Sequence, residues 1–279
     1  MILSVILVSA FLTQDPVQTA HLQFDSGTYT AAVKTLTAAL AQSPGDASLH
    51  YWIARSYYEL RNYDEAVRHA ETSVKLAPEN AEYNRWLGRA YGAKADQSRS
   101  FFLARKVKQA FEAAVRLAPG SIAARRDLMQ YCVEAPWIVG GDKDKARKQI
   151  EAISALDPLQ GRMARAAYLA TDKQWKAAES EYLSILDQHP QHIDAYIEAA
   201  DFFADRKDAK NLERTVEAAS RVDLRDPRAG YYQAISLILN RKELSTAEQL
   251  LNSYIANVPE KSEYPSHASA QAWISRIGR

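Results

Sequence analysis

Apolar residues recur at helical spacing along most of the chain, and each such stretch ends at a proline. Three stretches carry this pattern in nearly the same form: AVRHAETSVKLAP (66–78), VKQAFEAAVRLAP (107–119) and ARKQIEAISALDP (146–158). Within each, apolar residues return every three or four positions, which is the period of one face of an α-helix. Proline cannot continue a helix because it has no amide hydrogen. The pattern therefore predicts amphipathic helices that end at these prolines.

A second helical pattern, rich in aromatic residues, precedes these stretches. It is clearest in HYWIARSYYELRNYDEA (50–66) and in NRWLGRAYG (84–92). Proline recurs at positions 44, 78, 119, 158, 190, 227 and 259, at intervals of 34, 41, 39, 32, 37 and 32 residues. Such recurrence is typical of repeat proteins, whose helix hairpins must stack because one hairpin cannot bury both of its faces. We therefore expect a solenoid of hairpins.

The hairpins resemble tetratricopeptide repeats. Unit 47–80 carries the family pattern almost in full, in Trp52, Ile53, Ala54, Tyr57, Tyr63, Ala66 and Pro78, and unit 13–46 keeps Gly27, Tyr29, Ala32, Leu36, Ala39 and Pro44. The resemblance implies an all-α fold, a right-handed superhelical solenoid of about seven helix hairpins with a C-terminal capping helix. The expected units are 13–46, 47–80, 81–121, 122–160, 161–192, 193–229 and 230–259, and the cap lies within 260–279.

Small and large apolar residues alternate in a way that suits this packing. Ala54, Ala66, Gly88 and Ala178 are expected where two antiparallel helices cross, because a short side chain lets the helix axes approach. Trp52, Tyr57, Trp86 and Tyr91 are expected to fill the space between one hairpin and the next.

Unit 122–160 is longer than the 34-residue period, and the excess is APWIVGGDKDKA (135–146). Pro136 is expected to end the first helix, Gly140 and Gly141 to allow a turn with positive φ, and Asp142 to cap the second helix. A phosphate loop would need a Lys-Ser/Thr pair after its glycines, and this segment has none. A calcium loop would need acidic residues at alternate positions, and Arg147 and Lys148 stand where that series would continue. We interpret the segment as an enlarged turn whose Trp-Ile-Val tip covers a neighbouring repeat or a partner.

Unit 81–121 is also longer, but residues 93–111 contain no helix breaker. The seven extra residues correspond to two helical turns, so both helices of this hairpin are expected to be extended. Phe101, Phe102 and Leu103 would then lie near a projecting tip. They either pack against the insert of the next unit or serve as a docking knob.

The first residues need separate treatment. MILSVILVSAFLTQDP is apolar from Ile2 to Leu12 apart from two serines, and it is too short to span a bilayer. Val8-Ser9-Ala10 has the small-residue pattern of a signal-peptidase site, although no Lys or Arg precedes the apolar run. We expect residues 1–12 to be an export signal and the protein to be periplasmic or secreted. The alternative is an ordinary first helix in a cytoplasmic protein.

Charge and candidate chemistry narrow the function. Lys and Arg number 35 and Asp and Glu 34, so the net charge of +1 indicates neither a nucleic-acid partner nor a polybasic membrane anchor. The single cysteine, Cys132, is expected to be a buried, inert thiol. His189 and His192 are read as part of a polar loop between repeats, not as metal ligands. No catalytic motif occurs, so we expect a protein that is not an enzyme and that uses no cofactor and no metal.

In tetratricopeptide folds the first helices of successive units line a concave groove. By that resemblance the groove presents Tyr51, Arg55, Tyr58, Arg85, Arg89, Arg126 and Gln130 from the N-terminal half, and Asp194, Asp201 and Asp205 from the C-terminal half. Arginine binds carboxylates bidentately, which favours an acidic peptide segment or a free C-terminus as the partner, with Tyr51 and Tyr58 as stacking surface. The alternative is that these residues form a solvated charged face.

Two functions remain open. The first is a scaffold that binds a protein or peptide in the concave groove without chemistry. The second is an extracytoplasmic accessory protein that carries a small organic anion for a transporter. An open, charged groove would favour the first, and a closed, apolar channel would favour the second.

Overall fold

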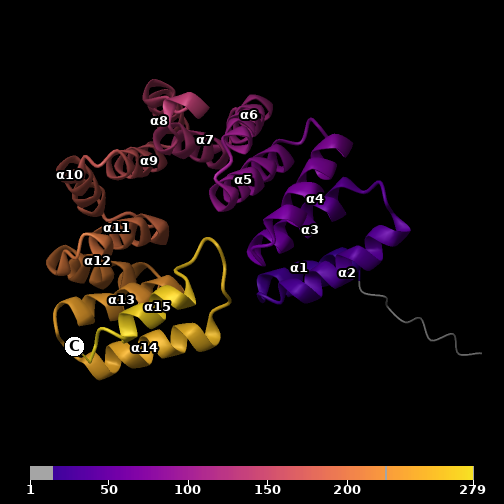
Figure 1. Ribbon diagram of the computed structural model, residues 1–279. Helices are drawn as coiled ribbons and strands as arrows, with labels where there is room; N and C mark the ends of the chain where they lie inside the picture. Colours follow the sequence, from indigo (N-terminus) through magenta and orange to yellow (C-terminus); the bar gives the residue numbers. More distant parts are fainter. Residues whose placement is uncertain (1–14, 224, 279) are drawn as a thin grey trace, which may run out of the picture.

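The computed structural model describes residues 15–223 and 225–278. Within these ranges the chain forms fifteen α-helices and one short 3-10 helix (Figure 1). The elements are α1 (Pro16–Asp25), α2 (Tyr29–Gln42), α3 (Ala47–Glu59), α4 (Tyr63–Leu76), α5 (Ala81–Ser98), α6 (Phe101–Leu117), α7 (Ile122–Glu134), η1 (Trp137–Val139), α8 (Lys143–Leu156), α9 (Pro158–Thr171), α10 (Trp175–Leu186), α11 (Ile193–Asp205), α12 (Ala209–Val222), α13 (Pro227–Leu239), α14 (Leu244–Asn257) and α15 (His267–Ile274). The predicted signal segment, residues 1–12, lies outside the described residues.

Consecutive helices pack as hairpins, from α1 with α2 to α13 with α14, and α15 packs on α13 and α14. The first helices also contact one another from α3 through α5, α7, α9 and α11 to α13, so they form an inner layer. The predicted all-α solenoid of seven hairpins with a C-terminal cap is therefore confirmed. None of the described helices has both the length and the hydrophobicity needed to cross a membrane.

Short polar residues two positions after Pro44, Pro78 and Pro119 start three of the inner helices. Asp46, Asn80 and Ser121 are the N-caps of α3, α5 and α7, and each side chain accepts a hydrogen bond from an amide of the first turn. Such caps satisfy amides that have no partner inside the helix. In α3, α5 and α7 the spacing of proline and cap therefore sets where the helix begins, and with it which side chains face the groove.

The small residues lie at helix crossings, as the sequence predicts. A β-carbon built on Gly88 would lie 2.5 Å from the ring of Phe111, so α5 and α6 cross at this glycine. Ala54, Ala66 and Ala178 are buried as well. Trp86 is 4% exposed and packs edge-on against Tyr58 of the preceding repeat.

The insert between α7 and α8 follows the predicted turn with one correction. Gly140 has a φ of 110°, and the carboxylate of Asp142 caps α8 by accepting from the Lys145 amide. Gly141 does not have positive φ. It is required for space, because a β-carbon there would lie 1.8 Å from the carbonyl oxygen of Ala135.

Both helices of the third hairpin are extended, to 18 residues in α5 and 17 in α6. The turn between them is made by Arg99, whose φ of 53° is left-handed, and by Ser100, which caps α6. No breaker residue marks this turn in the sequence. Phe101 and Phe102 begin α6 and are 68% and 69% exposed, so they do not pack against the following insert.

The two ends of the solenoid meet. The connector between α14 and α15, drawn in yellow in Figure 1, reaches the first three hairpins. The Tyr29 hydroxyl donates to the carbonyl oxygen of Glu260 at 2.8 Å, and the amide and hydroxyl of Ser262 both donate to Glu59, each at 2.8 Å. Arg89 donates to Glu263 at 3.2 Å. The hairpins therefore form a closed ring whose inner layer is the groove.

Candidate partner-binding groove

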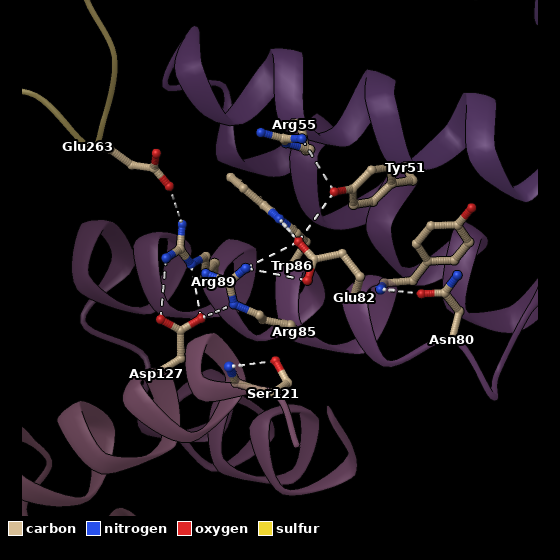
Figure 2. A network of polar contacts seen from close by, with 12 residues as sticks. Tyr51, Arg55, Asn80, Glu82, Arg85, Trp86, Arg89, Ser121, Asp127 and Glu263 are labelled. Carbon is tan, nitrogen blue, oxygen red and sulfur yellow. Dashed lines mark hydrogen bonds and ion pairs between the residues drawn. The ribbon is translucent and has the colours of Figure 1, made fainter. Parts of the chain in front are cut away.

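The inner helices α3, α5 and α7 form what we call the basic wall, and α11 and α13 form the acidic wall. On the basic wall, Arg85 and Arg89 converge on one carboxylate (Figure 2). The Nε atoms of Arg85 and Arg89 lie 2.7 and 3.1 Å from Oδ2 of Asp127, which extends from α7. Burial alone would lower the pKa of Arg89, but the charge and hydrogen bonds of Asp127 raise that pKa above its ordinary value. Both arginines are therefore paired with an acid of the same chain.

Arg126 is neutralised by a different acid. Its Nη2 donates to Oε1 of Glu198 on α11 at 2.7 Å, and its Nη1 donates to Gln160 at 3.3 Å. The contact with Glu198 links α7 to a helix two repeats further along, on the acidic wall. Arg126 thus connects the two walls.

Arg55 differs from the other groove arginines. Its guanidinium carbon lies 4.5 Å from the ring centroids of both Trp52 and Trp86 and 4.6 Å from that of Phe24. Within the described part of the chain Arg55 forms no ion pair, and its buried Nε has no hydrogen-bond partner. The aromatic rings stabilise the cation through their faces and leave its charge without a counterion.

The remaining predicted residues of this half divide into packed and accessible groups. Tyr51 is 7% exposed, with its ring stacked on Tyr83 at a centroid distance of 4.8 Å. Tyr51 therefore packs between two repeats. The prediction that it offers a free stacking surface to a partner is wrong. Tyr58 and Gln130 line a pocket of about 700 Å³ together with Arg89 and Asp127. They are accessible from the groove.

The acidic wall carries carboxylates with fewer cations. Asp201 accepts a hydrogen bond of 2.6 Å from the Tyr232 hydroxyl, and Asp205 lies one helical turn further along α11. Burial and the charge of Asp201 raise the pKa of Asp205. Asp194 is paired with Arg228 at 2.8 Å. These residues line a second pocket, of about 450 Å³, between α11, α13 and the connector that closes the ring.

Sequence reasoning missed the acids that neutralise the basic wall. Asp127, Glu198 and Glu263 lie between 38 and 174 residues from the arginines that they contact. Asp127 is the only one with a sequence signal, because it follows Arg126 on the same inner helix as predicted groove residues. A register map of the inner helices would therefore have found Asp127, whereas Glu263 depends on ring closure.

Two other expectations concern reactive groups. Cys132 is buried, as expected, and burial raises the pKa of its thiol to about 11. Among the described residues there is no group of three or more His, Cys, Asp or Glu side chains placed to hold a metal ion. A buried histidine pair that the sequence did not single out joins α3 to α4, with the Nδ1 atoms of His50 and His69 2.9 Å apart.

Comparisons with known proteins agree with this architecture. A tetratricopeptide repeat family model matches residues 23–90. A tetratricopeptide repeat protein from Parabacteroides merdae is similar over 95% of this chain and 98% of its own, with a TM-score of 0.60 and 10% identity. A thermophilic tetratricopeptide repeat protein of Thermus thermophilus is similar over 68% of this chain and 98% of its own, with a TM-score of 0.55 and 22% identity. No curated protein matches the sequence. The family match identifies tetratricopeptide repeats over residues 23–90, and the similar solved structures show that the remaining hairpins share their fold.

Proposed function

We propose that this protein is an interaction scaffold without catalytic function that binds an extended segment of a partner protein across the closed ring. An acidic side chain or a terminal carboxylate of the segment contacts Arg55 on the basic wall. A basic side chain of the same segment contacts Asp201 and Asp205 on the acidic wall. Membership of the tetratricopeptide repeat family supports protein binding in general, and the charges of the groove support this form of it.

One observation carries the proposal: the charges that remain unpaired on the two walls have opposite signs. Arg55 on the basic wall has no described carboxylate partner, and Asp201 and Asp205 on the acidic wall have no described cation partner. Charges without internal partners favour a ligand of complementary charge, because the ligand gains attraction without displacing an existing ion pair. A segment with both signs complements both walls.

The second candidate, a carrier of a small organic anion, is less well supported. The ring is closed, as such a carrier requires. However, the two pockets described above, of about 700 and 450 Å³, contain Arg89, Asp127, Asp201, Asp205 and Arg228 among their lining residues. A small anion would meet carboxylates in both pockets, whereas an extended peptide can place each of its charges beside the opposite sign.

The partner is to be captured from native extract on the immobilised protein, identified by mass spectrometry, and reduced to the shortest segment that binds. We then expect Arg55→Gln to weaken that segment's binding tenfold or more, since a charge-assisted contact contributes about 1.5–3 kcal/mol. Arg116→Gln is the matched control, because Arg116 is exposed on the outer helix α6. Binding should also weaken as salt is added.

Arg55 is a better target than Arg85 and Arg89. Replacing those two arginines by alanine would leave Asp127, whose side chain is 16% exposed, without its partners, so stability would change together with binding. Equal affinities of the Arg55→Gln and Arg116→Gln proteins for the captured segment would contradict the proposed site.

A further inference from the structure

Four large apolar side chains protrude at the tips of the third and fourth hairpins. Phe101 and Phe102 are 68% and 69% exposed, and Trp137 and Ile138 of the insert are 85% and 53% exposed. We call these four residues the tip patch. They lie in the two hairpins whose extra length departs most from the 34-residue period.

The fold holds the two halves of the tip patch together. The Tyr131 hydroxyl lies 2.5 Å from the carbonyl oxygen of Ala104 in the first turn of α6 and 2.7 Å from that of Val139 in η1. Gly140 adds a second contact, since a β-carbon there would lie 2.6 Å from the side chain of Lys108. The turn that carries Phe101 and Phe102 is thereby fixed beside the turn that carries Trp137 and Ile138.

Cations without internal partners surround these rings. Arg99 precedes Phe101, while Arg105 and Lys108 follow Phe101 by four and seven residues, on the same face of α6. In the described ranges none of Arg99, Arg105 and Lys108 forms an ion pair, whereas the nearby Lys106 is paired with Glu71. One exposed carboxylate, Asp96, lies near this end of α5, and two more, Glu134 and Asp142, lie on either side of the insert. At the turn that carries Phe101 and Phe102, the three unpaired cations outnumber the single carboxylate Asp96.

The three rings and the side chain of Ile138 are exposed to solvent. None of them lines the neighbouring pocket of about 700 Å³, although Ala104, Pro136 and Val139 beside them do. A protein partner would have to supply a socket for each protruding ring. The headgroup region of a membrane accepts such rings without a preformed socket, because tryptophan and phenylalanine partition into it and basic side chains bind anionic lipids there.

We propose that the tip patch docks this protein on an anionic membrane surface, with the aromatic side chains inserted among the headgroups and Arg99, Arg105 and Lys108 on the lipid phosphates. This surface lies on the hairpin tips and is separate from Arg55 and the acidic wall. The proposal therefore does not depend on the function proposed for the groove.

The test uses the full chain with vesicles of phosphatidylcholine alone or mixed with phosphatidylglycerol. We expect sedimentation with the mixed vesicles, weaker binding at high salt, and at least a tenfold loss of binding in the triple variant Phe101→Ser, Phe102→Ser, Trp137→Ser. The matched control is Leu22→Ser, Leu76→Ser, Leu156→Ser, which removes three exposed leucines from other helices. Circular dichroism of both variants verifies that they are folded.

A local measurement separates the tip patch from the apolar residues 2–12. Brominated lipids should quench wild-type tryptophan fluorescence, and Trp137→Phe should remove most of that quenching. Absence of binding to mixed vesicles, or quenching that persists in Trp137→Phe, overturns the proposal. The proposal is also overturned if the wild-type protein self-associates but does not bind vesicles, and the triple variant no longer self-associates. That result would make the tip patch an interface between copies of the chain.

Discussion

The basic and acidic walls are both formed by inner helices of the same solenoid, but their charged side chains differ in how far they are paired within the chain. On the basic wall, Arg85 and Arg89 share Asp127, and Arg126 is paired with Glu198. On the acidic wall, Asp201 and Asp205 have a tyrosine and each other as neighbours, and burial together with Asp201 raises the pKa of Asp205. The repeat therefore fixes where a side chain points but not whether its charge is neutralised.

Paired and unpaired charges of the two walls are expected to have different roles. A neutralised charge with little exposure contributes to the stability of the ring, and its removal leaves a partner desolvated without compensation. An exposed charge without a partner contributes little to stability and is available to a ligand. Mutations of neutralised charges such as Asp127 should consequently be costly for folding, whereas mutations of Asp201 and Asp205 should be nearly neutral.

Trp86→Ala is expected to have the largest effect. Trp86 is 4% exposed, contacts the guanidinium of Arg55 and donates from Nε1 to Glu82 at 2.8 Å. Replacing a buried tryptophan by alanine costs about 3–5 kcal/mol, and in a solenoid the loss of coupling between repeats also broadens the unfolding transition. Urea unfolding measures both effects.

Trp137→Ala is the matched control for this prediction. Trp137 is 85% exposed, so we expect a change below about 0.5 kcal/mol. Equal urea midpoints for the two tryptophan variants would show that the basic wall is not held by the packing described.

Asp127→Ala should have the next largest effect. The side chains of Asp127, Arg85 and Arg89 are 16%, 13% and 22% exposed. Removal of the carboxylate leaves two largely desolvated guanidinium groups close together, each with only one more exposed acid, Glu82 for Arg85 and Glu263 for Arg89. The expected loss of unfolding free energy is roughly 3 kcal/mol. Asp187→Ala removes an acid from an exposed ion pair and should cost less than about 1 kcal/mol. If both variants lose the same free energy of unfolding, neutralised and available charges do not differ in their contribution to stability.

The sequence predicts the fold far better than the groove. Helical periodicity and the recurring prolines are local signals, and they placed the hairpins and the inner-helix residues. The partners of those residues are not local: Glu198 is 72 positions from Arg126, and Glu263 is 174 positions from Arg89. Which repeats face each other depends on small rotations summed over the whole solenoid. Ring closure therefore could not be derived from any single repeat.

Acid should weaken the repeat that carries Arg55. Arg68 donates to Nε2 of His69 at 2.8 Å, so His69 is neutral and its Nδ1 hydrogen bond joins it to His50. Burial, and then the charge of Arg68, lowers the pKa of His69 from 6.5 to about 4, and burial lowers the pKa of His50. Because the unfolded chain binds protons more readily, stability is unaffected above pH 6.5 and is lost as pH falls from 6.5 towards 4, by roughly 2 kcal/mol at pH 5.

Urea unfolding at a series of pH values measures this loss. His69→Gln should flatten the dependence between pH 6.5 and 4, whereas His192→Gln, at an exposed histidine, should leave it unchanged. A dependence that remains as steep in His69→Gln would assign the acid sensitivity to other groups.

The smallest expected effect has the opposite sign and lies on the acidic wall. Burial and Asp201 raise the pKa of Asp205, so the folded chain binds a proton at this carboxyl more readily than the unfolded chain does. The stability linked to this proton is complete below the ordinary aspartate pKa of about 4 and is lost as pH rises through the raised value. Asp205→Asn should therefore stabilise the protein at pH 7, by less than about 1 kcal/mol because the side chain is exposed, and the gain should vanish in acid. Asp64→Asn is the control, since Asp64 is an exposed aspartate paired with Lys94 and its removal should bring no gain. If Asp205→Asn instead destabilises the chain at pH 7, the carboxylates of the acidic wall are neutralised as fully as the arginines opposite them, and Asp205 is not available to a partner.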